Sequence, residues 1–171
     1  MTVGYRLATP SDGAALAVLG RRVFSETFGD HYAPDDLARH LDRAFGPEGL
    51  PAELADPAVR VMMAEEEGAM AAYLKLVPMT LPVEHPPGSL EIKQLYVLAP
   101  WQGKGVAQAL MDWALEAARA QGAPALYLSV WSQNARAIAF YRRYGFVVAG
   151  HAPFTVGGQT DMDPVMRLEL S

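Results

Sequence analysis

The turn at residues 102–107 (Gln-Gly-Lys-Gly-Val-Ala) contains the residue types that point most directly to chemistry. A strand-like run at 90–97 precedes this turn, and a long amphipathic helical pattern follows it. In such a turn, backbone N–H groups point outward and the helix dipole adds partial positive charge at the same place. Glycine lets the backbone approach an anion closely and adopt a positive φ without strain. The sequence therefore predicts a backbone cradle for a phosphorylated cofactor.

Two common phosphate-binding motifs do not fit the spacing of this turn. The G-x-x-x-x-G-K-[ST] run of a P-loop does not occur in the sequence. The dinucleotide fingerprint G-x-G-x-x-G fails because Gln108 stands at its third glycine position. In addition, residues 123–125 provide no acidic side chain where that fingerprint needs one. The pattern that fits is Q-x-x-G-x-A, carried by Gln102, Gly105 and Ala107.

A second motif follows at residues 128–146, where the pattern predicts a strand, a helix and another strand. Asn134 suits the N-cap of this helix, which typically contributes about 1 kcal/mol. Gly145 suits the position just after its end. Together with the first motif, the pattern N-x-x-A-I-x-F-Y-x-x-x-G-F resembles the acetyl-CoA site of the GNAT superfamily of N-acetyltransferases. The order and separation of the two motifs carry this resemblance.

Four further segments are similar to a bacterial subgroup of that superfamily, the spermidine/spermine N-acetyltransferases of the PaiA group. These segments are residues 25–28, 89–92, 130–131 and 158–161. The resemblance implies a GNAT-like α/β fold, with a mixed, mostly antiparallel sheet of about seven strands and helices on both faces. It also implies an acyltransferase that moves an acetyl group from acetyl-CoA to a primary amine. A small polyamine is the first expected acceptor, and a homodimer is common in the family.

Composition limits the class of protein. A length of 171 residues and a hydrophobic content of 51% indicate one domain over residues 1–171. No apolar run is long enough to cross a membrane. The absence of cysteine excludes disulfides and suits a cytoplasmic protein. The four histidines stand singly without ligand spacing, so we expect no metal. A net charge of −5 argues against nucleic-acid binding. This charge either keeps the protein soluble or attracts a cationic acceptor.

Hydrophobic periodicity and chain breakers predict the elements that position the motifs. We expect strands at 4–8, 59–64, 69–76, 90–98, 126–130, 146–148 and 165–170. Helices are expected at 10–22, from 34 onward, at 47–55, from 106 to about 121, and from 134 onward. The proline-rich stretch 78–88 predicts a loop. Antiparallel strands early in the chain and strand–helix–strand units later favour a mixed α/β sheet.

The resemblance places the cofactor along the first motif and the strand before it. The pyrophosphate would contact the backbone of Gln102, Gly103, Lys104, Gly105, Val106 and Ala107. The pantetheine arm would pair with Leu95, Tyr96 and Val97 like a short extra strand. Asn134 and Phe140 would line the same arm; the alternatives are pure N-capping for Asn134 and core packing for Phe140. We expect the Lys104 side chain to be exposed to solvent and to take no part in binding.

Two residues are candidates for proton transfer. Glu91 stands 11 positions before Gln102, the offset of a base glutamate in some GNAT members. Regular alternation puts Glu91 on the same face as Lys93 and Val97. A carboxylate that relays protons through water suits an amine of pKa near 10; the alternative is a surface pair with Lys93. Tyr141 matches the family tyrosine that protonates the departing thiolate. A phenol pKa near 10 lies above a thiol pKa near 8.5, and the alternative is a core tyrosine.

By analogy with the family, the acceptor site would lie where residues 24–32, 78–88 and 154–163 meet, with Glu26, Phe28 and Trp131 as candidate contacts. Trp131 either shapes this pocket or simply packs. Candidate partners for ammonium groups are Glu26, Asp30, Asp35 and Glu84, and the alternative for each is an ordinary surface charge. Other acceptors (an amino acid, a drug or a protein N-terminus) and a non-catalytic acyl-CoA-binding regulator stay open at this point.

Overall fold

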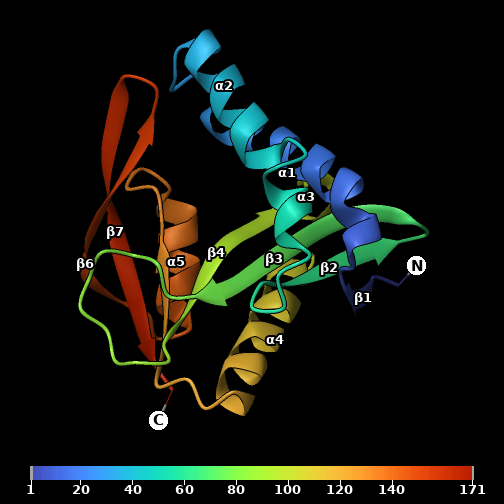
Figure 1. Cartoon of the computed structure of the whole chain (residues 1–171). Coiled ribbons are helices and arrows are strands. Elements are labelled where there is room, and N and C mark those ends of the chain that lie inside the picture. Colours follow the sequence, from blue (N-terminus) through green and yellow to red (C-terminus); the bar gives the residue numbers. More distant parts are fainter. Residues whose placement is uncertain (1, 171) are drawn as a thin grey trace.

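The computed structural model, which describes residues 2–170, has a seven-stranded sheet at its centre (Figure 1). The strands are β1 (Gly4–Leu7), β2 (Arg60–Glu66), β3 (Ala69–Pro78), β4 (Leu90–Val97), β5 (Ala125–Ser129), β6 (Val147–Val156) and β7 (Gln159–Glu169). Their spatial order is β1-β2-β3-β4-β5-β7-β6. Neighbouring strands are antiparallel except β4 and β5, which are parallel. The structure confirms the expected mixed, mostly antiparallel sheet.

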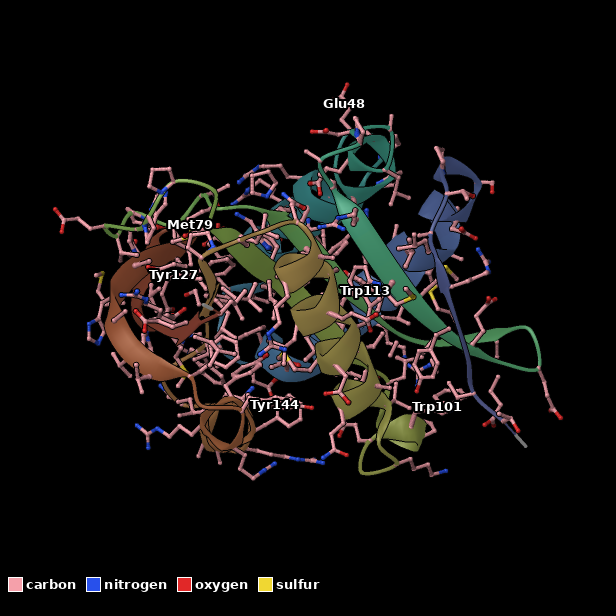
Figure 2. The ribbon with its side chains drawn as sticks, turned by 90° about the horizontal axis from the view of Figure 1, so that it is seen from below. Glu48, Met79, Trp101, Trp113, Tyr127 and Tyr144 are labelled. Atoms are coloured by element: carbon pink, nitrogen blue, oxygen red, sulfur yellow. The ribbon has the colours of Figure 1, made fainter. Side chains whose placement is uncertain are left out.

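Helices cover both faces of the sheet. On one face, which we call the α1 face, lie α1 (Gly13–Phe28), α2 (Pro34–Phe45) and α3 (Leu50–Glu53). On the other, the α4 face, lie α4 (Val106–Ala120) and α5 (Ala135–Arg143). Two short 3-10 turns, η1 (Pro10–Asp12) and η2 (Ala99–Trp101), precede α1 and the 102–105 turn. Seen from below, α4 lies across the sheet (Figure 2).

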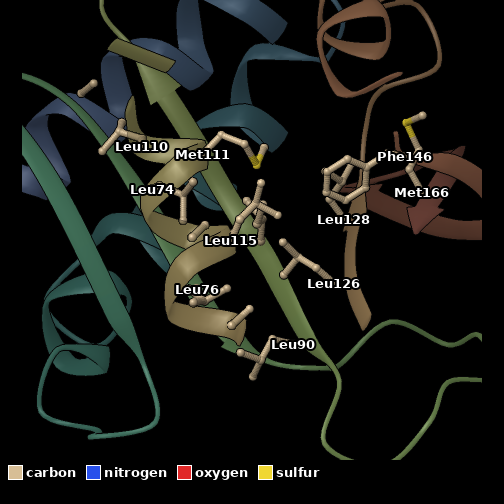
Figure 3. Packing of buried hydrophobic residues seen from close by; sticks show 14 of the residues in the cluster. Leu74, Leu76, Leu90, Leu110, Met111, Leu115, Leu126, Leu128, Phe146 and Met166 are labelled. Carbon is tan, nitrogen blue, oxygen red and sulfur yellow. The ribbon is translucent and has the colours of Figure 1, made fainter. Parts of the chain in front are cut away.

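The core on the α4 face holds the 102–105 turn in place. The buried residues of α4 form one apolar stripe, at the spacing of the amphipathic pattern expected after the turn: Val106, Leu110, Met111, Ala114, Leu115 and Ala118. They pack in one cluster with leucines of β3, β4 and β5 (Figure 3). Full burial of a leucine typically contributes about 1.5–3 kcal/mol, so this contact fixes the first turn of α4 against the sheet.

Helix α1 is longer than the sequence pattern predicted. It begins at Gly13, after the η1 turn, and continues to Phe28 rather than ending near Arg22. No glycine or proline interrupts the chain between Arg22 and Gly29, and the buried Phe24 extends the apolar face. As a result, Phe28 lies on α1 and not in a connecting segment.

Strands β6 and β7 form a hairpin that is much longer than the predicted pieces at 146–148 and 165–170. The middle of this hairpin escaped prediction because Gly150, Pro153 and Pro164 interrupt the strand-like pattern. Polar residues also alternate along β7, and the side chains of Asp161 and Asp163 share the α1 face.

An irregularity in β4 decides the geometry of the cleft described below. Lys75 of β3 pairs with Gln94, but the next residue, Leu76, pairs with Ile92. Lys93 is therefore the extra residue of a β-bulge. Beyond it, β4 and β5 separate, because their pairing ends at Ile92 and Leu128. The edge of residues 93–97 that faces away from β3 is left without a strand partner.

Candidate active site

A cleft of about 950 Å³ opens where β4 and β5 separate. Residues from β4, the end of β5, the 101–108 region, α5, α1 and β7 line it. The cleft brings together most of the residues predicted from the sequence: Phe28, Glu91, Leu95, Tyr96, Val97, Gln102, Gly103, Gly105, Ala107, Trp131, Asn134, Phe140 and Tyr141. Three other candidates, Glu26, Lys104 and Val106, do not line it, and Val106 is a core residue.

The 102–107 turn has the conformation that the glycines predicted. Gly103 and Gly105 have φ values of +74° and +83°, in the left-handed region that favours glycine. Within residues 2–170, the N–H groups of 103–108 donate to no backbone acceptor. A Cβ atom added at either glycine would have no neighbouring atom within 4 Å. Free donors at the start of a 15-residue helix thus face open space, which fits a phosphate group.

Gln102 ties this turn to the sheet and to α5. Its Nε2 donates to the carbonyl of Val97 at 3.0 Å, and its Oε1 accepts from Nη1 of Arg136 at 3.4 Å. Arg136 also lines the cleft, so it adds a positive charge beside the turn. Our sequence prediction missed Arg136; the signal for it was a cationic residue in the first turn of a motif helix.

Asn134 and Phe140 show that the two alternatives considered for each residue are compatible. Asn134 caps α5, because its Oδ1 accepts from the N–H of Ala137 at 3.1 Å. Asn134 also lines the cleft, and its Nδ2 donates to no acceptor within residues 2–170. Phe140 packs against the α4-face core and against Tyr144, at 5.3 Å between ring centroids, and it lines the cleft as well.

Tyr141 lies on α5 with its ring against Phe146, at 5.9 Å between centroids. Its hydroxyl makes no hydrogen bond within the described part of the chain, and the residue lines the cleft. Burial raises the pKa of Tyr141 to about 12. Burial first, and then the charge of Tyr141, raise the pKa of Tyr96. The Tyr141 phenol is thus a protonated donor that faces the cleft.

Glu91 does not lie where regular alternation placed it. The bulge at Lys93 puts Glu91 on the α1 face with Tyr96, whereas Val97 packs on the α4 face. Glu91 is also not a surface residue, since it is only 2% exposed. Its Oε1 accepts from the N–H and the Oγ1 of Thr80, at 3.0 and 2.6 Å, while Lys93 Nζ lies 3.8 Å from Oε2.

The segments expected around the acceptor do meet at the cleft. An aromatic wall, defined as Phe24, Phe28, Trp131 and Phe154, lines it on the α1 side. Ring centroids are 4.7 Å apart for Phe24 and Phe28, and 5.1 Å for Phe28 and Trp131. Trp131 therefore both packs and shapes the cleft.

The acidic candidates fall outside this cleft. Glu26 and Asp30 line a separate pocket of about 280 Å³ that shares Thr27 and Trp131 with the cleft, and Glu26 pairs with Arg22 at 3.0 Å. Asp35 and Glu84 line neither pocket. Apart from Glu91, the acidic side chain that lines the cleft is Asp163 of β7, which is 6% exposed. Asp163 ends one of the segments expected at the acceptor site, but it was not among the individual candidates.

Residues 2–170 contain no group of three His, Asp or Glu side chains able to hold a metal ion. None of their helices has the length and apolarity needed to cross a membrane.

Comparison with known proteins identifies the family. The profile of the Acetyltransferase (GNAT) family matches residues 21–146. The chain belongs to the acetyltransferase (GNAT) family. It is therefore an acyltransferase, and its co-substrate is acetyl-CoA. The open cradle and the unpaired edge of β4 fit the phosphates and the amide-bearing arm of that molecule.

The relatives of this GNAT chain agree with the assignment. An uncharacterized N-acetyltransferase of Lactobacillus delbrueckii subsp. lactis is 29% identical over 89% of this chain and 88% of its own length. One of Mycobacterium tuberculosis is 29% identical over 94% of this chain and 99% of its own. The crystal structure of the PaiA N-acetyltransferase from Thermoplasma acidophilum, in complex with coenzyme A, has a TM-score of 0.80 at 18% identity, with 99% of both chains covered. At this sequence identity, the structural similarity shows the fold alone.

Proposed function

We propose that this GNAT enzyme transfers the acetyl group of acetyl-CoA to a primary amine of a small polyamine, of the spermidine or spermine kind. The observation that carries the proposal is the pair of buried carboxylates, Glu91 and Asp163, in the cleft that also contains the cradle. Such an acceptor arrives as a cation, because an alkyl amine has a pKa near 10. Buried carboxylates favour cationic partners over neutral or anionic ones.

Acetyl-CoA, when bound, supplies the thioester whose carbonyl carbon receives the amine. The N–H groups of residues 103–108 and the guanidinium of Arg136 would bind its phosphates. The free edge of residues 95–97 would pair with its amide groups, and Asn134 and Phe140 would line the same arm.

Glu91 is the proposed proton acceptor for the reacting amine. Thr80 occupies Oε1 with two hydrogen bonds and thereby fixes the carboxylate. Oε2 accepts no hydrogen bond within residues 2–170, and its ion pair with Lys93 Nζ is long, at 3.8 Å. This oxygen is free to accept a proton from the ammonium, directly or through one water molecule, which leaves a neutral amine able to attack.

Tyr141 is the proposed proton donor for the departing thiolate. Its raised pKa keeps the phenol protonated at neutral pH, and its hydroxyl is not engaged elsewhere in the described chain. A phenol pKa of about 12 lies well above the pKa of a free thiol, near 8.5, so Tyr141 acts mainly by hydrogen-bonding the sulfur as negative charge develops.

One observation favours a second acceptor class, an amino acid. Lys93 also lines the cleft, where its Nζ donates to Thr80 Oγ1 at 2.9 Å. The same ammonium group can pair with the α-carboxylate of an amino-acid acceptor whose amine faces Glu91. A polyamine has no group that benefits from Lys93, so acceptor screening separates the two classes.

The direct test is release of free thiol from acetyl-CoA by the purified protein, across a panel of polyamines, amino acids and monoamines. Turnover with spermidine and spermine well above that with amino acids supports the proposal. Turnover with amino acids alone contradicts the polyamine acceptor and keeps the transferase. The cytoplasmic location, expected from the absence of cysteine, and the homodimer, implied by the resemblance, stay predictions.

A further inference from the structure

Of the two buried carboxylates in the cleft, Asp163 has fewer hydrogen-bond and cationic partners to stabilise its negative charge. Its one hydrogen bond within residues 2–170 is a long one, 3.4 Å from the N–H of Ser132 to Oδ1. It forms no ion pair with a Lys, Arg or His side chain of the described chain. Glu91 is different, because it accepts two bonds from Thr80 and has a lysine nearby. A buried charge with so little compensation is costly unless a ligand supplies the missing cation.

The groups that face Asp163 do not provide this cation. Asp161 lies two residues earlier on the same face of β7. The nearby imidazole of His31 pairs with Asp161 instead, since its Nε2 is 2.8 Å from Oδ2 of Asp161. Tyr32 also donates to Asp161, at 3.2 Å. Burial is the largest effect on the pKa of Asp163 and raises it; the N–H of Ser132 lowers this pKa, the charge of Asp161 raises it, and His31 lowers it least. The Asp163 carboxylate is therefore the member of this cluster that gains most from a cationic ligand.

The aromatic wall indicates which part of the ligand would be attached to the cationic group. Phe24, Phe28, Trp131 and Phe154 carry no charge, and they line the same cleft as Asp163. Such a surface suits a methylene chain, and aromatic faces also attract ammonium groups. A ligand with methylene groups between two amines matches a cleft that has an apolar wall and two buried carboxylates.

We propose that Asp163 binds the ammonium group of the acceptor that is not acetylated, so that the enzyme selects amines with a second positive charge. This inference rests on the proposed function. Glu91 accepts the proton of the amine that reacts, and Asp163 binds the amine that stays protonated. Asp163 is thus the residue that distinguishes a diamine from a monoamine of the same length.

The test compares putrescine with butylamine, which has the same carbon chain and one amine fewer. For the unmodified enzyme we expect a higher kcat/KM for putrescine. Asp163→Asn, which keeps the shape and removes the charge, should lower kcat/KM for putrescine by about 10-fold or more, mainly through KM, and change butylamine by about 2-fold or less. The control Glu169→Gln, at a 70% exposed side chain of the same strand, should change neither.

Acetyl-CoA affinity, measured by calorimetry, should be unchanged in Asp163→Asn, and this verifies that the variant is folded. An unchanged preference for putrescine in Asp163→Asn overturns the inference and leaves the proposed function intact. Equal use of putrescine and butylamine by the unmodified enzyme also overturns it, and needs no variant. Absence of thiol release with every amine contradicts the proposed function itself.

Discussion

Glu91 and Tyr96 face the same side of β4, although they are five positions apart and regular alternation would put them on opposite sides. The cause is the bulge at Lys93, which resets the alternation between them. The same irregularity marks the point beyond which β4 and β5 separate. One extra residue thus marks the start of the cleft and puts the carboxylate of Glu91 on the α1 face, where the acceptor site is proposed.

The first prediction concerns Glu91. Glu91→Gln should lower kcat/KM for the amine by about 10-fold or more at neutral pH, because the general base is lost. The loss should shrink as the pH approaches the amine pKa, near 10, since the amine then loses its proton to solvent. The measurement is the pH profile of kcat/KM. A deficit of equal size at every pH would indicate structural damage instead. Glu116→Gln, at an exposed position of α4, is the matched control.

The second prediction concerns Tyr141. Tyr141→Phe should lower kcat by about 10-fold or more and leave acetyl-CoA affinity unchanged, because only the hydroxyl is removed. The raised pKa of about 12 means that the phenol loses its proton only as the pH rises toward that value. In the unmodified enzyme, this group should therefore cause no fall in rate below about pH 11.

Tyr144→Phe provides the control for the second prediction. Tyr144 is the C-cap residue of the same helix but reaches toward α4, where its hydroxyl donates to the carbonyl of Gln108 at 3.3 Å and to Asp112 at 3.1 Å (Figure 2). It does not line the cleft. Tyr144→Phe should keep kcat within about 2-fold, with a small loss of stability. Equal turnover of the two variants would remove Tyr141 from the mechanism.

Local patterns were enough to predict the cradle. On the acceptor side of the cleft, the resemblance indicated the right segments, but local patterns did not place the individual side chains. The 102–107 turn and the stripe of α4 depend on residues close together in the chain, so spacing alone predicted them. The face of Glu91 depends on a bulge defined by pairing with Lys75, and its partner Thr80 comes from a loop. Asp163 is buried by the fold of a long hairpin whose middle lacks a strand-like pattern. These features arise from contacts between distant segments.

The third prediction concerns Gly105. Gly105→Ala should weaken acetyl-CoA binding by about 10-fold or more. The new Cβ adds an atom to the cradle in space that is open in this structure, and alanine resists the positive φ of this position. Gly68→Ala is a close control, because Gly68 has a φ of +79° and no atom within 4 Å of a Cβ, but lies in the turn between β2 and β3. Both variants should lose similar stability, about 1–2 kcal/mol. Calorimetry should show weakened binding only for Gly105→Ala, and equal binding by both would contradict the cradle.

The fourth prediction concerns stability in acid. Arg6 of β1 donates to both carboxylate oxygens of Asp12 at 2.9 Å and to Glu65 of β2 at 2.6 Å, so it joins the η1 turn to the edge of the sheet. The Arg6 hydrogen bonds first, and then the N–H of Thr9, lower the pKa of Asp12 to about 2. A lowered folded-state pKa means that this stabilisation is fully present above the unfolded value, near 3.8, and is lost as the pH falls through about 2.

Asp12→Asn should therefore lower the Tm of the protein at neutral pH and flatten the dependence of Tm on pH between about 4 and 2. The partial exposure of Arg6 keeps the effect modest. Asp42→Asn is the control, because Asp42 also pairs with an arginine, Arg21, at 2.9 Å, but its side chain is 75% exposed. Its Tm curve should run parallel to that of the unmodified protein. If the Asp12→Asn curve also runs parallel, the Arg6–Asp12 pair does not contribute to acid stability, and the start of α1 is held by packing alone.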